Sequence, residues 1–176
     1  MADFDINGYI GYFKGGARSN LFYFKPMFPA AAGLDMSKQG KFLVRTTNTP
    51  DSTLEQIITS WQVFDYKMGG KHTFNDITVT FNVDLNAKIR QAYEQWIELI
   101  HNPFDNYYAL PSEYMQDQYM QMLDYQGNII LEFKIYQAFP TTLGPISLDY
   151  ATVDVAQFDV TFTYQYHTTA QVGTAV

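Results

Sequence analysis

The side chains that could support catalysis or metal binding are few and widely spaced. The three histidines, His72, His101 and His167, lie far apart, and none has a second histidine at the i, i+4 spacing of a zinc-binding helix. The chain contains no cysteine, which excludes a disulfide and any thiolate metal site. We therefore expect no metal centre built from these residues, and no cofactor.

The remaining polar motifs also fail to match known reactive sites. Gly69-Gly70-Lys71 resembles the end of a phosphate-binding loop, but Asp65 stands where the first glycine belongs and His72 replaces the final Ser or Thr. There is no Gly-x-Ser-x-Gly motif. Four aspartates stand beside predicted turns or strand ends, where aspartate normally caps the backbone: Asp65, Asp76, Asp84 and Asp149. The sequence predicts a protein that is not an enzyme.

Composition indicates an ordered, acidic protein. The 176 residues suit one domain, aromatic residues make up 17% and charged residues 16%, and the formal net charge is −7. This negative net charge is unlike that of a protein that binds nucleic acid tightly, which carries a basic patch or stripe. No stretch has the length of a membrane span, and residues 1–16 lack the pattern of a signal peptide, so we expect a soluble protein made in a reducing cytoplasm.

Alternation of apolar and polar residues predicts mainly β structure. The clearest strand is 74–83, with Ile77, Val79 and Phe81 on one face, and Tyr125-Gln126-Gly127-Asn128 is a hairpin turn signal. Strands are predicted at 20–25, 41–47, 61–66, 74–83, 120–123, 129–136 and 157–166, with a short one within 141–150. The first two are predicted to pair as a long-looped hairpin.

Helices are predicted at two places. Residues 85–101 place Leu85, Ile89 and Trp96 on one apolar face, with Asp84 or Asn86 as the cap. Residues 51–60 carry Ser52 and Glu55 at capping-box spacing, which predicts a short helix or helical loop. A turn is predicted at 68–71, after the extended segment 61–66. The fold class is therefore mainly β: an antiparallel β-sandwich or barrel with one flanking α-helix. Its parts are a flexible N-terminal arm at 1–20, a β domain at 21–167 and a weakly structured C-terminal tail at 168–176.

Residues 66–96 combine a glycine turn, a Phe-x-Asp motif before a Thr-Val-Thr-Phe strand, an Asp near the strand end, and a helix carrying Arg90 and Trp96. This combination resembles the tail tube protein family of contractile-tailed bacteriophages. Segments 17–22, 46–50, 139–141, 146–150 and 158–164 fit the same pattern. The sequence departs from it at Ser19, where proline is frequent, and in a longer tyrosine-rich stretch between the helix and Met120.

The resemblance implies a structural virion protein that forms stacked hexameric rings, the phage tail tube, through which DNA is ejected into the host. Its partners would be further copies of itself, the tail sheath, the baseplate, the tail terminator and transiently passing DNA, with assembly in the host cytoplasm and no membrane contact. Polar strand faces are then lumen candidates: Thr78, Thr80, Asn82, Asp159, Thr161, Thr163 and Gln165. The arm and the loops 26–40 and 47–60 are candidates for contacts between rings, with Tyr9, Tyr12, Phe13, Asp51, Leu54 and Glu55 as the residues involved.

Three other interpretations remain open from the sequence. One is a related ring at the baseplate end of a tail, or the tube of a secretion system or bacteriocin. Another is a ligand-binding β-sandwich that uses exposed tyrosines to hold a sugar or similar ligand. A hydrolase is the third, and it is disfavoured by the absence of any catalytic constellation.

Overall fold

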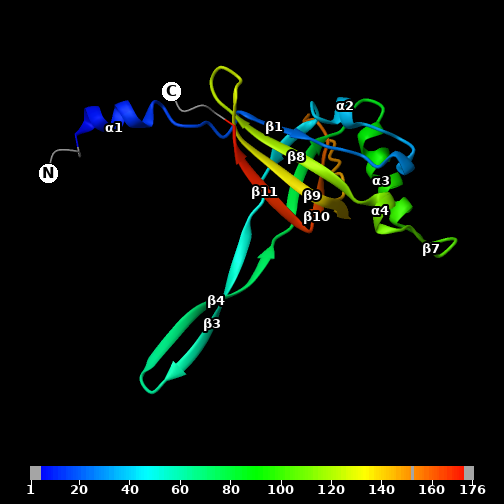
Figure 1. Ribbon diagram of the computed structural model, residues 1–176. Coiled ribbons are helices and arrows are strands. Elements are labelled where there is room, and N and C mark those ends of the chain that lie inside the picture. The colour runs from blue at the N-terminus through cyan, green and yellow to red at the C-terminus, as the bar shows by residue number, and fades with distance from the viewer. Residues whose placement is uncertain (1–4, 152, 173–176) are drawn as a thin grey trace.

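Two antiparallel sheets that share one long strand form the body of the molecule, shown in Figure 1 as a computed structural model that describes residues 5–151 and 153–172. Sheet A consists of β1 (Phe22–Lys25), β8 (Gln116–Leu123), the first part of β9 (Ile129–Leu143) and β11 (Tyr166–Gln171). Sheet B consists of the end of β9, β10 (Gln157–Thr163), β5 (Ile77–Asn82) and β2 (Val44–Thr47). The predicted fold class, mainly antiparallel β with a flanking helix, is confirmed.

Burial follows the predicted alternation in β5. Ile77, Val79 and Phe81 are buried, whereas Thr78 and Thr80 point away from the core. In the neighbouring strand β10, Phe158, Val160 and Phe162 are buried in the same way. Fully burying side chains of this size stabilises the fold by about 1.5–3 kcal/mol each, so these rows fix which face of sheet B points inward.

Helix α3 (Lys88–Ile100) covers the inner face of sheet B. Its Tyr93 ring lies 5.2 Å from Phe81 and 6.3 Å from Phe158, measured between ring centroids. The buried Trp96 donates its indole N–H to the carbonyl oxygen of Tyr114 at 2.9 Å, so its polar atom is satisfied. The predicted helix is confirmed, but it begins later than predicted, and Leu85 lies outside it, fully exposed.

Of the two proposed caps for this helix, Asp84 is the acceptor. Its Oδ1 receives the backbone N–H of Ile89 at 3.1 Å, and its carbonyl oxygen receives that of Ala87 at 2.8 Å. A carboxylate at a helix start satisfies amides that have no partner within the helix.

The predicted helix at 51–60 is wrong, because this segment is strand β3 (Ser52–Trp61), paired in a long hairpin with β4 (Phe64–Phe74). The chain reverses at Gln62, whose φ of 55° suits a two-residue hairpin turn. The turn predicted at 68–71 is also wrong, because Gly69 and Gly70 lie inside β4 at a shift of register. A Cβ on Gly70 would lie only 3.1 Å from the Glu55 carbonyl oxygen, so glycine here permits close backbone approach.

Pairing also differs from the prediction at both sheet edges. Strands β1 and β2 do not form a hairpin, because β1 pairs with β8 and β2 pairs with β5. The predicted strand 157–166 divides into β10 and β11, and β11 extends to Gln171, so residues 168–171 of the tail predicted as weakly structured are paired with β9. Residues 144–150 contain no strand; β9 itself ends at Leu143.

Short elements complete the connections. Within the arm predicted as flexible, residues 6–13 form helix α1 (Ile6–Phe13), which leaves the body in Figure 1. The others are the 3-10 helix η1 (Ala30–Ala32), α2 (Ser37–Gly40), the two-residue pair β6 (His101–Asn102) with β7 (Tyr107–Tyr108), and α4 (Pro111–Tyr114). Among the described residues, no helix is long and apolar enough to cross a membrane.

Candidate assembly surfaces

The outward face of sheet B carries a ladder of hydroxyl, amide and carboxylate groups. Thr80 donates to Asp159 Oδ1 at 2.6 Å, and the hydroxyl oxygens of Thr78 and Thr161 lie 3.2 Å apart across the same pair of strands. Thr163 donates to Asp76 Oδ1 at 2.8 Å. We call the following residues the polar ladder: Thr78, Thr80, Asn82, Asp159, Thr161 and Thr163.

The polar ladder brings together all but one of the predicted lumen candidates. Gln165 lies beyond the end of β10, in the link to β11, where its backbone N–H donates to the Tyr136 carbonyl oxygen at 3.2 Å. The ladder contains the carboxylate of Asp159 and no basic side chain. The Thr78 and Thr161 hydroxyls bond to each other, and those of Thr80 and Thr163 donate to carboxylates. A phosphate backbone passing over it would find no cation to bind.

Sheet B has two outer edges. At one edge β2 has β5 as its single partner strand within residues 5–151 and 153–172, and at the other the last residues of β9, Phe139–Leu143, pair with β10. An outer strand presents unpaired backbone N–H and C=O groups, which are available to the strands of another chain. Sheet B is therefore able to continue into neighbouring copies on both sides.

The β3–β4 hairpin projects from the body as a two-stranded ribbon (Figure 1), and every residue of β3 is exposed. The register pairs Trp61 with Phe64, Thr59 with Tyr66, and Ile57 with Met68. Because alternate cross-strand pairs share one side of a ribbon, these residues lie together on one face. The intervening pairs, such as Ser60 with Asp65, which share a 2.6 Å hydrogen bond, face the other way. We call the first set the apolar hairpin face.

Polar and aromatic groups join this hairpin to the body at its base. The Asn75 side chain donates to Asp51 Oδ2 at 3.1 Å, and the Tyr164 hydroxyl donates to the Asp51 carbonyl oxygen at 3.2 Å. The His167 ring stacks edge-on against Phe74 at 5.3 Å. Burial lowers the pKa of His167, helped by nearby His72 and opposed by Asp51, and burial raises the pKa of Tyr164 to about 12.

Helix α1 carries a second unpartnered apolar surface. Ile6, Tyr9, Ile10 and Phe13 follow the helical spacing i, i+3, i+4, i+7, all are exposed, and no residue of the helix is buried. Tyr125 fastens the arm to the body: its hydroxyl lies 2.9 Å from the Gly15 carbonyl oxygen and 3.0 Å from that of Gly16. An apolar stripe of this kind, held away from the core, is typical of a segment that packs on a partner.

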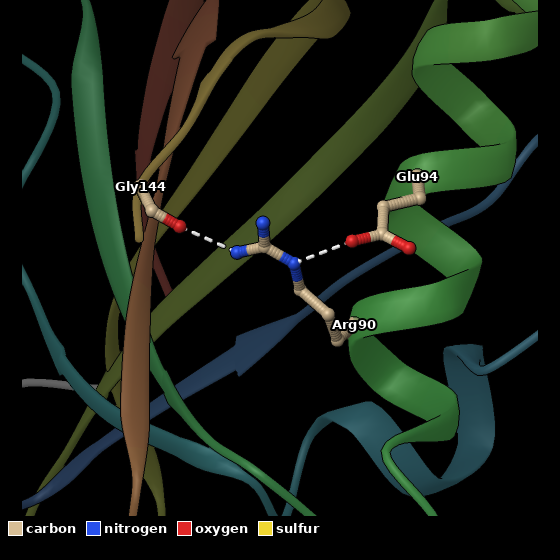
Figure 2. Close-up of polar contacts among 3 residues, drawn as sticks. All are labelled: Arg90, Glu94 and Gly144. Carbon is tan, nitrogen blue, oxygen red and sulfur yellow. Dashed lines mark hydrogen bonds and ion pairs between the residues drawn. The ribbon is translucent and has the colours of Figure 1, made fainter. Parts of the chain in front are cut away.

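Arg90 holds α3 against the strand connection that follows β9 (Figure 2). Its guanidinium donates to the Gly144 carbonyl oxygen at 2.5 Å and to Glu94 Oε1 at 2.8 Å, and lies over the Phe158 ring at 5.2 Å. Gly144 N–H in turn donates to the Asp159 carbonyl oxygen at 2.7 Å. The helix, the β9–β10 connection and the polar ladder are thus linked through one side chain.

The residues predicted to contact other rings fall on two elements. Tyr9, Tyr12 and Phe13 are exposed on α1, and Leu54 and Glu55 are exposed on β3. Asp51 instead lies at the base of the hairpin, where it bonds Asn75 and Tyr164.

The apolar hairpin face was missed by sequence reasoning. A signal for it exists in the alternation of Ile57, Thr59 and Trp61 on one side of Gln62-Val63 and of Phe64, Tyr66 and Met68 on the other.

Edge strands and projecting apolar elements are features of structural assembly proteins. The family model described as phage tail tube protein matches residues 18–170. A tail tube protein of Serratia phage KSP90 is 30% identical over 129 residues, covering 72% of this chain and 73% of the relative. The chain therefore belongs to the phage tail tube protein family, and it is a structural component of a virion and not an enzyme.

Solved structures share the fold at low sequence identity. The tube-terminating cap of the anti-feeding prophage matches with a TM-score of 0.67 and 17% identity, covering 89% of this chain and 91% of that one. The sheath–tube complex of the extracellular contractile injection system PVC matches with a TM-score of 0.62 and 18% identity, covering 89% and 92%.

Proposed function

We propose that this chain forms stacked hexameric rings that make the tail tube of a contractile-tailed phage, a conduit through which DNA is ejected into the host. The observation that carries the proposal is sheet B, which has a polar outward face and two outer edges. Pairing of β2 with the end of β9 of the next copy closes a continuous barrel around the ring and removes both unpaired edges. The polar ladder then lines the lumen.

The chemistry of the polar ladder suits the passage of DNA. Asp159 repels phosphate, and the ladder hydroxyls bond to each other or to carboxylates, so a moving duplex meets no fixed cation on the ladder strands β5 and β10. The net charge of −7 acts in the same direction.

Contacts between rings involve the two elements that leave the body. The apolar hairpin face and the stripe of α1 each bury their exposed side chains on the adjacent ring, in keeping with the predicted roles of the arm and of loop 47–60. Tail sheath, baseplate and terminator proteins bind the outside and the ends of the tube, and assembly takes place in the host cytoplasm.

The lumen assignment is tested by adding positive charge to the ladder. Asp159→Lys with Thr161→Lys is expected to leave tube length normal and to slow DNA ejection, measured as loss of nuclease-protected DNA from virions triggered on host cells. Slowing should diminish at higher salt, because phosphate–lysine contacts are screened.

A matched control places the same charge change on the outward face of sheet A. Glu132→Lys with Thr168→Lys uses residues on β9 and β11 that face outward in the pairing of those strands. Normal ejection by this control and slowed ejection by the ladder variant support the proposal. The reverse result would show that sheet A lines the lumen.

A single terminal or baseplate ring is a second candidate, because structures of an anti-feeding prophage cap and baseplate share this fold. Electron microscopy of the purified protein separates the two: long tubes support the tail tube, and isolated rings support a terminal ring. A stable monomer under all conditions would instead favour the ligand-binding β-sandwich.

A further inference from the structure

The loop between α3 and α4 exposes Phe104, and strand pairing, ring stacking and a hydrogen bond hold the loop in this conformation. Strands β6 and β7 pair through His101 with Tyr108 and Asn102 with Tyr107, and the His101 and Tyr108 rings stack at 4.2 Å. At the tip the Phe104 N–H donates to Asn102 Oδ1 at 2.9 Å. The Phe104 side chain is 94% exposed, and Tyr107, Tyr108 and Leu110 are exposed beside it. We call residues 101–110 the aromatic loop.

The aromatic loop lies on the opposite side of sheet B from the polar ladder. It follows α3 directly, and α3 packs on the inner face of sheet B through Tyr93 against Phe81 and Phe158. The ladder residues alternate with those buried rings and therefore face away from α3. In Figure 1 the loop, labelled β7, extends from the body on the side away from α1.

This geometry determines whether the aromatic loop lies near the axis of a tube or at its outer surface. If the polar ladder faces the lumen, as the proposed function on which this inference rests requires, α3 and the aromatic loop point outward. An exposed aromatic cluster at the outer radius is accessible to a surrounding protein layer.

The charge of the loop specifies the partner surface. Residues 101–110 contain the acid Asp105 and no lysine or arginine, and the acids Glu98 and Glu113 flank them in sequence. A complementary partner therefore offers an apolar pocket for Phe104 with basic residues at its rim. We propose that the aromatic loop is a docking knob for the protein that sheathes the tube, with Phe104 as its anchor.

Hydroxyl-radical labelling of Phe104, Tyr107 and Tyr108 tests the proposal in three states: monomer, tubes assembled from this chain alone, and whole tails. We expect equal labelling in monomer and bare tubes, and at least about fivefold protection in whole tails. Trp61 serves as the internal control, because it should become protected as soon as tubes form.

The outcomes are distinguishable. Protection of Phe104 already in bare tubes would overturn the proposal, because the partner would be another copy of this chain. Full labelling in whole tails would overturn it as well, because nothing would then cover the loop. Failure of the protein to form tubes at all, with Trp61 still labelled, would refute the proposed function instead.

Variants add a second measurement. Phe104→Ser is expected to form normal bare tubes and to bind purified sheath protein at least about tenfold more weakly, whereas Phe104→Tyr keeps the ring and should bind within about twofold of the original. Equal sheath binding by the serine variant would contradict a role for Phe104 as anchor.

Discussion

Replacing Phe64 by serine should impair tube assembly while leaving the folded monomer intact. Phe64 is 79% exposed on the apolar hairpin face, opposite Trp61, so the monomer loses few contacts and its stability should change by no more than about 0.5 kcal/mol. A phenylalanine buries about 200 Å² when fully covered. About 160 Å² of Phe64 therefore remains for a neighbour to cover.

At about 25 cal/mol per Å², covering that area contributes about 4 kcal/mol to each ring contact. Part of this is offset by ordering of side chains and imperfect fit, which leaves about 2 kcal/mol. A loss of that size corresponds to a rise of about 30-fold in the concentration at which tubes form. Sedimentation of tubes over a concentration series measures this threshold, and thermal unfolding of the monomer measures stability.

The matched control for this variant is Phe104→Ser, which removes an even more exposed phenylalanine from the aromatic loop. Its assembly threshold should stay within about twofold of that of the original chain. If Phe64→Ser assembles at the original concentration, the apolar hairpin face does not bind the next ring. If both variants are impaired equally, general loss of surface aromatics explains the effect and the reasoning from position fails.

Three further predictions follow from other parts of the fold. Deleting residues 1–16 should leave a folded protein that no longer polymerises; normal tubes from the truncation would remove the arm from the ring contact. Tyr93→Phe should stabilise the chain by about 1 kcal/mol in denaturant unfolding, because the buried hydroxyl has no partner among the described residues; destabilisation would reveal one. Because the pKa of His167 is lowered in the folded chain, the unfolded chain binds a proton more readily, so stability should be full above pH 6.5 and decline as pH falls below it. Thermal unfolding from pH 7 to 5 measures this decline, and His167→Gln should make it less steep.

The parts of the fold that could be predicted are those where one face of an element is buried. Alternation in β5 and the apolar stripe of α3 were both read correctly, because Ile77, Phe81, Tyr93 and Trp96 all pack into one core. The β8–β9 hairpin was found from its turn, where Asp124 accepts the N–H groups of Gln126 and Asn128. At these places the local turn hydrogen bonds and the burial of one face favour the same structure, and such agreement makes an element predictable from its sequence.

The β3–β4 hairpin was misread because no core acts on it. Ser52 and Glu55 have the spacing of a capping box, yet Thr53, Ile57, Ile58 and Thr59 favour extended backbone, and pairing with β4 decides the outcome. Gly69-Gly70 looks like a turn, although it marks close approach of two strands at a shift of register. Sequence alone could not separate these alternatives, because the partner strand determines which one holds.

In a protein that assembles, apolar residues follow the same spacing in the core and on the surfaces that bind other copies, and this explains the remaining errors of the sequence-based prediction. A subunit that assembles must expose apolar side chains in the monomer at spacings that match the partner, so Trp61, Phe64 and Phe13 have the same pattern as core residues and are exposed nonetheless. The polar ladder contains no lysine or arginine, although exposure to water alone would allow either residue there. Two features of a single sequence therefore predict a conduit that assembles from copies of one chain: apolar alternation in a ribbon that packs on no core, and a polar strand face without cations. The two lysine-pair variants test the polar face, and the paired serine variants test the ribbon independently.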